Sequence, residues 1–447
     1  MKILTPEKVN ELLIKLKRNG FEAFIVGGCV RDSILGKTPH DWDICTNAKP
    51  DEIKKCLSEY HTIDTGIKHG TVSVEIDREI FEITTYRIDG EYSDNRHPKN
   101  VNFTVNIADD LARRDFTINA IAYNDEKGIV DPYHGCEDLK LGIIRCVGDP
   151  KKRFREDALR IIRALRFASV YGFKMDFSTS DAALDNRILL NNISAERIAG
   201  EVNRLVCGDG AEKILNDYRD VFAVFMPEIV QTFDYEQHTK HHNRDVWHHT
   251  THAVSLIEAK PLLRITMLFH DLGKPDACKR DADGTCHFKG HPKYSAIYAN
   301  DILRRLKYPN YFIETCLTLI IFHDVRFNGT KKQIKRVMNK IGVQNTKMLF
   351  KVQRADILAQ SGYLQKEKLE AIDLAENKFN EIISEESCFT LKQLAVNGND
   401  LINIGVAEGK TIGNILKLLL GLVIDEKVVN TREALLEKAK NIIRDIQ

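Results

Sequence analysis

The hydrophobic pattern of this 447-residue chain changes near residue 150, and that change constrains the fold more than any other feature. Before it, short runs rich in β-branched residues predict strands over residues 23–26, 72–76 and 80–84. After it, apolar residues recur at three- and four-residue steps almost to the C-terminus, which is typical of helices. We therefore expect an α+β protein with a mixed sheet in the N-terminal third and helices in the remainder.

The length and composition suit several packed domains. A chain of 447 residues is about three times a typical domain, and its 43% of hydrophobic residues is ample for packed cores. The net charge of +1 conceals a basic stretch over residues 151–166, where seven Lys or Arg residues face only Glu156 and Asp157. Such a stretch suits a polyanion such as RNA, and the alternative is a solvated helix face.

The sequence shows no sign of secretion or of a membrane anchor. The ten cysteines include no Cys-x-x-Cys pair, and we interpret them as reduced, mostly buried thiols. The N-terminus lacks the pattern of a signal peptide, and no apolar run approaches the roughly 20 residues that cross a bilayer. We expect a cytoplasmic protein without a membrane partner, and the oligomeric state stays open.

Two aspartates, Asp41 and Asp43, follow the paired glycines Gly27 and Gly28 after twelve residues. In an extended strand, side chains two residues apart share a face, with their Cα atoms roughly 6.5–7 Å apart. Two carboxylates on one face can hold a pair of Mg²⁺ ions for phosphoryl transfer. The glycines would let the backbone approach a triphosphate where a side chain would clash. The alternative is a surface turn with two solvated acids.

Other polar residues of the N-terminal third fit the same chemistry. Glu82 lies in an otherwise apolar predicted strand, where an ionised carboxylate requires a cation or, alternatively, an edge position facing water. Arg113 and Arg114 offer bidentate contacts to phosphate oxygens. Asp115 and Asn119 could bind the ribose hydroxyls of a nucleotide.

The predicted helix over residues 156–170 carries Asp157, Arg160 and Arg163 at three-residue spacing on one face. Asp157 can accept a hydrogen bond from an exocyclic amine, and Arg160 can donate to a ring acceptor. Cytosine and adenine present that amine beside a ring acceptor, whereas uracil and guanine would leave mismatched polar groups. The pair could therefore accept CTP and ATP; the alternative is an ordinary surface ion pair.

Four short motifs occur in order along the first 160 residues. They are Gly-Gly-Cys-Val-Arg-Asp at 27–32, Asp-Trp-Asp at 41–43, Arg-Arg-Asp at 113–115 and Glu-Asp-x-x-Arg at 156–160. The series resembles that of class II tRNA nucleotidyltransferases, the CCA-adding enzymes of the DNA polymerase β-like superfamily. The resemblance extends over residues 1–200, including a later neck motif at 193–197. It implies a polymerase β-like nucleotidyltransferase head followed by all-helical parts.

The resemblance also implies roles for individual residues. Asp41 and Asp43 would hold Mg²⁺ and activate the 3′-hydroxyl of an RNA, with Glu82 as a third catalytic carboxylate. Arg31, in the glycine motif, would belong to the nucleotide-binding residues. The segment 88–102, which we predict to be a loop, resembles the flexible element linked to the switch from C to A addition.

Histidines and aspartates form a second ordered series in the helical part. Histidine nitrogens and carboxylates suit divalent transition metals, and the series resembles the HD superfamily of metal-dependent phosphohydrolases over about 235–360. The predicted ligands are His249, His270, Asp271 and Asp356, with His291 and His323 as ligands that could hold a second ion. The resemblance implies phosphatase or cyclic phosphodiesterase activity on RNA ends or nucleotides. The alternative is a set of structural histidines without metal.

These inferences divide the chain into four parts. A strand over residues 143–147 closes the head. The predicted domains are a nucleotidyltransferase head over 1–147, a neck that binds RNA and the nucleobase over 148–234, an HD phosphohydrolase-like domain over 235–345 with Asp356 just beyond it, and a helical body and tail that binds tRNA over 346–447.

We expect template-independent addition of CCA to tRNA 3′ ends from CTP and ATP by two-metal nucleotidyl transfer, with a possible HD hydrolase activity. A bacterial poly(A) polymerase, or an enzyme that adds only C or only A, shares most of these motifs. A hypothesis of another class is an HD phosphohydrolase whose head only binds nucleotides.

Overall fold

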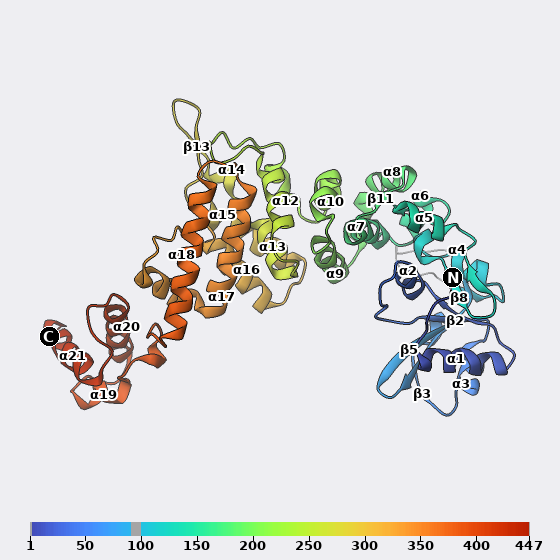
Figure 1. The fold of residues 1–447 in the computed structure, drawn as a ribbon, viewed down its shortest axis with the longest axis horizontal. Coiled ribbons are helices and arrows are strands. Elements are labelled where there is room, and N and C mark those ends of the chain that lie inside the picture. Colours follow the sequence, from blue (N-terminus) through green and yellow to red (C-terminus); the bar gives the residue numbers. More distant parts are fainter. Residues whose placement is uncertain (1, 91–99, 447) are drawn as a thin grey trace. The chain divides into compact units, whose positions relative to one another are not determined.

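The computed structural model describes residues 2–90 and 100–446 (Figure 1). The chain divides into two compact units. The first contains Met1–Pro227 with Arg305–Lys307, and the second contains Glu228–Arg304 and Tyr308–Gln447. Most of the predicted C-to-A switching segment, residues 91–99 of 88–102, lies outside the described residues. No helix of the described residues is both long and apolar enough to span a membrane.

The first unit is built on a seven-stranded sheet in the order β3-β4-β5-β2-β1-β8-β9. The pairing of β2 with β5 is parallel and the other five pairings are antiparallel, so the predicted mixed sheet is confirmed. The strands are β1 (Ala23–Val26), β2 (Ile44–Thr46), β3 (His61–Gly66), β4 (Thr71–Ile76), β5 (Glu79–Thr85), β8 (Ala122–Asn124) and β9 (Gly128–Val130). A separate hairpin pairs β6 (Arg87–Asp89) with β7 (Val101–Phe103).

Short helices accompany this sheet. They are α1 (Glu7–Arg18), α2 (Gly28–Ile34), α3 (Pro50–Cys56), α4 (Ile107–Ala112) and α5 (Gly135–Leu141). In α1, Val9, Leu12 and Leu16 fall on one face and are fully buried, as helical periodicity requires. That face packs on β1 and α3, next to the apolar strand Ala23–Val26.

The predicted strand 23–26 is confirmed, and the predictions at 72–76 and 80–84 lie inside β4 and β5. Two other strand predictions are wrong in part. Asp41 and Asp43 precede β2, which begins at Ile44. The strand predicted at 143–147 is limited to β10 (Ile143–Ile144), which pairs with β11 (Lys174–Met175) and does not close the main sheet.

The helix predicted over residues 156–170 is interrupted. It consists of α6 (Pro150–Glu156) and α7 (Leu159–Tyr171), and Asp157 lies between them with extended backbone angles (φ −138°, ψ 104°). The Asp157 carboxylate accepts a hydrogen bond from the Leu159 backbone N–H at 3.1 Å, which competes with helix formation at this point. The other helices of this unit are α8 (Phe177–Asp185), α9 (Ala195–Val206), α10 (Ala211–Asp217) and α11 (Arg219–Phe222).

The second unit is almost entirely helical, as the sequence predicts. Its helices are α12 (Val246–Leu256), α13 (Pro261–Phe269), α14 (Lys274–Ala277), α15 (His291–Arg305), α16 (Asn310–Phe322), α17 (Lys331–Ala359), α18 (Gln365–Ser384), α19 (Gly398–Asn403), α20 (Lys410–Ile424) and α21 (Arg432–Ile446). One small hairpin joins β12 (Lys279–Arg280) to β13 (Cys286–His287). The predicted boundary at 345/346 falls within α17, whose backbone is interrupted at Gly342 (φ 81°).

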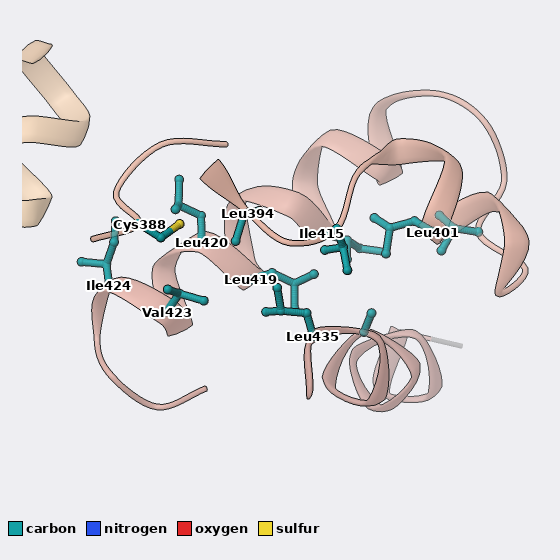
Figure 2. Packing of buried hydrophobic residues seen from close by; sticks show 12 residues of the cluster. Cys388, Leu394, Leu401, Ile415, Leu419, Leu420, Val423, Ile424 and Leu435 are labelled. Atoms are coloured by element: carbon teal, nitrogen blue, oxygen red, sulfur yellow. The ribbon is translucent and has the colours of Figure 1, made fainter. Parts of the chain in front are cut away.

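The last three helices share a small apolar core. Leu401 of α19, Leu419 of α20 and Leu435 of α21 are fully buried against one another's helices (Figure 2). Cys388 and Leu394, which precede α19, complete one side of this cluster (Figure 2). The C-terminal segment therefore has its own packed core, apart from the core of the long helices before it.

Two helical glycines make a matched test of the packing in the first unit. A Cβ on Gly135 would lie 2.1 Å from the backbone oxygen of Thr117, whereas a Cβ on Gly200 in α9 would meet nothing within 4 Å. We expect Gly135→Ala to lower the free energy of unfolding by about 1–3 kcal/mol. Gly200→Ala should raise it by about 0.5–1 kcal/mol. Denaturant unfolding of both variants measures this; equal effects would contradict the close contact.

Candidate active site and candidate metal centre

The acidic residues of the head converge where three strands meet. The Val26 N–H at the end of β1 donates to the Asp43 carbonyl at 3.0 Å, just before the paired glycines. On the other side, β2 pairs in parallel with β5 and aligns Ile44 with Ile83, so Asp43 lies beside Glu82. Because Ile44 and Ile83 are buried, the side chains one position earlier project to the opposite face of the sheet.

Asp41, Asp43 and Glu82 are all exposed on this face. Desolvation raises the pKa of Asp43, and the negative charges of Glu82 and Asp41 raise it further, while Arg114 opposes them. Such mutual repulsion is relieved by a cation, and a set of carboxylate oxygens suits Mg²⁺. In the described part of the chain, the oxygen atoms of these three carboxylates do not all lie within 4.8 Å of one another. The three acids therefore form an open acidic face.

Gly27 occupies a position that excludes other residues. Its φ of 78° is strained for an L-residue, and a Cβ there would lie 2.8 Å from Nη1 of Arg114. Gly28 begins α2, and a Cβ on it would lie 3.6 Å from Nη2 of Arg31. Gly27 therefore lets β1 end in contact with Arg114, whereas a Cβ on Gly28 would make only an ordinary contact with Arg31.

Both arginines predicted to bind phosphate are held by a carboxylate that the sequence analysis did not single out. Asp110 accepts from Arg113 Nε and Nη2 at 2.9 and 2.8 Å, and from Arg114 Nη2 at 3.3 Å. Burial would raise the pKa of Asp110, but Arg114 and Arg113 lower it below its ordinary value. The spacing of three and four residues on and after α4 was the available signal.

Asp115, Asn119, Arg31 and Arg163 form one hydrogen-bonded network. Asp115 Oδ2 accepts from Arg163 Nε and Nη2 at 3.0 and 2.7 Å, and its Oδ1 accepts from Asn119 Nδ2 at 3.0 Å. Arg31 Nη1 donates to Asn119 Oδ1 at 2.6 Å. Although burial acts to raise the pKa of Asp115, Arg163 and Asn119 hold it below its ordinary value. The structure thus brings these predicted residues together, from α2, the turn after Phe116, and α7.

Asp157 and Arg160 do not pair with each other. Asp157 Oδ2 accepts from Arg197 Nη2 at 3.1 Å, and Arg160 donates to Glu156 Oε2 at 2.8 Å. Arg160 also donates to the Arg113 carbonyl at 3.1 Å and is 9% exposed. The alternative of an ordinary surface ion pair between the two is therefore not found, and both side chains have other polar partners.

Much of the charge of the basic stretch over 151–166 is paired within the protein. At least five of its seven cations form ion pairs: Lys151 with Asp185, Arg153 and Arg160 with Glu156, Arg163 with Asp115, and Arg166 with Glu201. The interpretation of this stretch as an RNA-binding surface is therefore weakened, because most of its charge already has a structural partner.

The predicted HD ligands are brought together in the second unit. His249 on α12 lies 3.0 Å from Asp356 on α17 and 3.3 Å from Asp271, and His270 lies 3.1 Å from Asp271. Ligand atoms of these four residues all lie within 4.8 Å of one another. The two further candidates form a second set with the same aspartate.

In that second set, His291 on α15 and His323 after α16 lie 3.2 and 3.7 Å from Asp271 Oδ1. Asp271 Oδ2 faces His249 and His270, so the aspartate is shared by both sets. The arrangement can hold two ions bridged by one carboxylate.

Backbone carbonyls orient the four imidazoles. Nδ1 of His249, His270, His291 and His323 lies 3.3, 2.6, 2.8 and 2.7 Å from the carbonyls of Ala359, Met267, Phe288 and Ile320. A carbonyl only accepts, so each Nδ1 carries a proton and each ring turns its Nε2 toward the aspartates. Nε2 atoms of His291 and His323 lie only 3.0 Å apart. Two facing lone pairs require a cation or a proton between them.

The charges of the cluster also favour a cation. Burial lowers the pKa of His270, but Asp271 and Asp356 raise it to about 10. Nε2 of His270 and Oδ2 of Asp271 are buried, and the Lys274 ammonium lies 2.6 Å from this Oδ2, so the carboxylates already attract positive charge. Imidazole nitrogens and carboxylates are the ligands of Mn²⁺, Fe²⁺ and similar ions, so the residues fit such a metal.

Comparisons with known proteins give the family. Residues 23–145 match the model of the Poly A polymerase head domain, and residues 291–439 match that of tRNA nucleotidyltransferase domain 2. The model called Probable RNA and SrmB- binding site of polymerase A matches residues 172–231. A CCA-adding enzyme of Ligilactobacillus salivarius is 31% identical over 98% of this chain and 97% of its own. The chain belongs to the CCA-adding enzymes.

Solved structures of this enzyme family agree. The CCA-adding enzyme of Bacillus stearothermophilus in complex with CTP is 27% identical and covers 99% of both chains with a TM-score of 0.71. The Thermotoga maritima CCA-adding enzyme complexed with tRNA covers 99% of this chain and 100% of its own, with a TM-score of 0.58 at 19% identity. At 19% identity, the similarity to the Thermotoga maritima enzyme supports the fold alone. The predicted head followed by helical parts is confirmed.

Asp115→Asn tests the buried network. The variant keeps the shape of the side chain but removes the negative charge that pairs with Arg163. In the wild type, Arg163 Nη2 donates a charge-assisted hydrogen bond of 2.7 Å to this carboxylate. We expect the free energy of unfolding to fall by about 2–3 kcal/mol at pH 7. Asp185→Asn, in the exposed pair with Lys151, should change it by less than about 1 kcal/mol.

The same variant has an expected pH dependence. Because the pKa of Asp115 is lower in the folded protein than the unfolded value near 3.9, its contribution is present above that value and lost as the pH falls through the folded pKa. The difference between wild type and Asp115→Asn should therefore shrink below about pH 4. A difference that stays constant in urea unfolding from pH 7 to pH 3 would contradict the assignment.

Proposed function

We propose that this CCA-adding enzyme extends tRNA 3′ ends with C, C and A, using CTP, ATP and Mg²⁺. The observation that carries the proposal is the β2–β5 register, which sets Asp43 beside Glu82 on an open acidic face next to Gly27. The related enzymes with CTP, with ATP and with tRNA support the choice of substrates. The reaction would take place in the cytoplasm, in keeping with ten cysteines that remain thiols.

Asp41 and Asp43 would hold the Mg²⁺ ions, with Glu82 as the third acid. When bound, the ions would neutralise the triphosphate and lower the pKa of the RNA 3′-hydroxyl. Arg114, beside Gly27 and paired with Asp110, adds positive charge where the phosphates would approach. The Asp115 network would fix the ribose-binding residues relative to α7, which carries Arg160 and Arg163.

Asp157 and Arg160 would select the nucleobase. Their present partners, Arg197 and Glu156, hold the two side chains near the junction of α6 and α7. An incoming cytosine or adenine would replace these contacts with an amine donor to Asp157 and a ring acceptor for Arg160. Uracil and guanine would leave the hydrogen-bonding groups of both side chains unsatisfied. This cost discriminates against the wrong base more strongly than the favourable contacts select the right one.

Nucleotide incorporation on tRNA lacking its CCA end tests this function. With CTP and ATP together we expect exactly three additions, and with CTP alone only two. Open-ended A tails from ATP alone would instead identify a poly(A) polymerase, and arrest after one kind of nucleotide would identify a C-only or A-only enzyme.

Asp157→Ala should relax selection against UTP and GTP by about 1–3 kcal/mol, measured as ratios of kcat/KM. Unchanged ratios would remove Asp157 from base selection.

A second function is favoured by the HD cluster, in which four imidazole Nε2 atoms face two carboxylates. We propose that this cluster holds divalent transition metals and hydrolyses phosphoesters of nucleotides or RNA ends. His249, His270, Asp271 and Asp356 would hold one ion, and Asp271, His291 and His323 the second. When bound, the metals would supply a nucleophilic water and neutralise the phosphate. Variants of the two sites distinguish this two-activity enzyme from the alternative, an HD phosphohydrolase whose head only binds nucleotides.

Asp43→Ala should abolish incorporation and leave p-nitrophenyl phosphate hydrolysis intact, because the two sites share no residue. His270→Ala should do the reverse. Circular dichroism and the retained activity serve as the folding controls for each variant. If Asp43→Ala left incorporation unchanged, the head would not be the site of transfer.

Metal loading should release protons. Because the metal-free pKa of His270 is about 10, this imidazole carries a proton at pH 7.5 and must lose it to bind a metal through Nε2. We expect Mn²⁺ binding to release about one proton, measured by calorimetry in buffers of different ionisation enthalpy. His270→Ala should lose that release. Binding without proton release in the wild type would contradict the proposed ligand.

A further inference from the structure

The HD cluster opens into a cavity of about 1420 Å³ that is far larger than a phosphate group requires. Asp271, His291, His323 and Asp356 line it on one side. On another part of its wall lie Lys368, Arg326 and His241, together with the aromatic side chain of Tyr363. None of these four has a role in metal binding.

Lys368 is tied to the metal cluster by hydrogen bonds. Its ammonium donates to Gln360 Oε1 at 2.6 Å, and Gln360 Nε2 in turn donates to Asp356 Oδ2 at 3.1 Å. Lys368 also donates to His241 Nδ1 at 3.0 Å. The ammonium is therefore fixed two hydrogen bonds away from a ligand carboxylate, and its hydrogen-bonding partners are neutral groups.

Arg326 adds a second cation at the same place. Desolvation and the charge of Arg326 lower the pKa of Lys368, while Asp356 opposes them. Desolvation and then the charges of Lys368 and Arg326 lower the pKa of His241. Across residues 2–90 and 100–446, no ion pair to a carboxylate is formed by Lys368 or Arg326. Two cations that line the same cavity without a carboxylate partner among the described residues favour the binding of an anion there.

An aromatic surface lies beside these cations. The rings of His241 and Tyr363 lie 5.1 Å apart, and Tyr363 is 46% exposed at the cavity. An exposed tyrosine ring next to basic side chains is the usual platform for a nucleobase joined to phosphate. A simple phosphate ester bound at the metals would contact neither the Tyr363 ring nor the cations Lys368 and Arg326.

From this geometry we propose an anion subsite formed by Lys368, Arg326 and His241, which binds a second phosphate of the HD substrate. The substrate class is a nucleotide that carries two phosphate groups, one at the metals and one at this subsite, with its base against Tyr363. A free nucleoside bisphosphate and the 3′-phosphorylated end of an RNA strand share this chemistry. The inference rests on the proposed hydrolase function and deepens it.

Hydrolysis by Mn²⁺-loaded enzyme tests the subsite with three probes. They are p-nitrophenyl phosphate, adenosine 3′,5′-bisphosphate and an RNA trinucleotide ending in a 3′-phosphate. In Lys368→Gln and in Arg326→Gln, kcat/KM for the two-phosphate probes should fall about tenfold more than for p-nitrophenyl phosphate, mainly through KM. The two nucleotide probes distinguish the two kinds of substrate. An enzyme that acts on RNA ends prefers the trinucleotide, and one that acts on free nucleotides prefers adenosine 3′,5′-bisphosphate.

Lys366→Gln is the matched control. Lys366 is on the same helix as Lys368 but outside the cavity lining, and it pairs only loosely with Glu370 at 3.9 Å. Its variant should match the wild type on all three probes. Equal losses on all probes in Lys368→Gln and Arg326→Gln, or no losses, would overturn the subsite.

Failure of the hydrolase itself gives a different result. If no probe is hydrolysed, the proposed HD activity fails, and equilibrium binding of labelled adenosine 3′,5′-bisphosphate decides the subsite. Weaker binding in Lys368→Gln and Arg326→Gln than in Lys366→Gln would support it, because binding by the head is common to all variants. Equal binding in the three variants would overturn it.

Discussion

The first unit depends on a buried carboxylate that is neutralised from other elements. Moving a carboxylate out of water costs several kcal/mol unless charges and hydrogen bonds replace the water. Asp115 obtains both, from Arg163 on α7 and from Asn119. Arg31 then reaches Asn119 from α2, with its guanidinium 5.1 Å from the rings of Phe167 and Tyr171. The need to neutralise one charge thus ties α7 to Asp115, to the turn that carries Asn119 and, through Arg31, to α2.

Strands and helices with one strong apolar pattern were predictable, and the positions where a side chain competes with the backbone were not. Ala23–Val26 is fully apolar and matches its prediction residue for residue. The helix over 156–170 has continuous helical periodicity, yet the Asp157 carboxylate takes the Leu159 N–H and opens the helix. That break gives Asp157 extended backbone angles, so it cannot share a helical face with Arg160 and Arg163 as the spacing suggested.

Residue type did not predict the partners that the site residues have in the structure. Arg113 and Arg114 were assigned to phosphate, and the structure shows that Asp110 already binds both. The sequence contains this pairing as an ordinary i,i+3 and i,i+4 spacing, but the same spacing is common on exposed helices where it has little consequence. Burial of Asp110 is what makes the pairing strong, and burial is a property of the whole fold.

The two candidate metal sites differ in the way expected of their ions. The acids of the head are exposed, which suits Mg²⁺, because this ion keeps several waters and would arrive with a triphosphate. The four histidines of the HD cluster are buried, and backbone carbonyls hold each ring with its Nε2 inward. The order of the ligands along the chain predicted their convergence, but the orienting carbonyls come from the last turns of α13, α16 and α17 and from Phe288 before α15. Such a preformed nitrogen-rich cage suits a resident transition metal, which exchanges slowly with water and does not depend on the nucleotide for its binding.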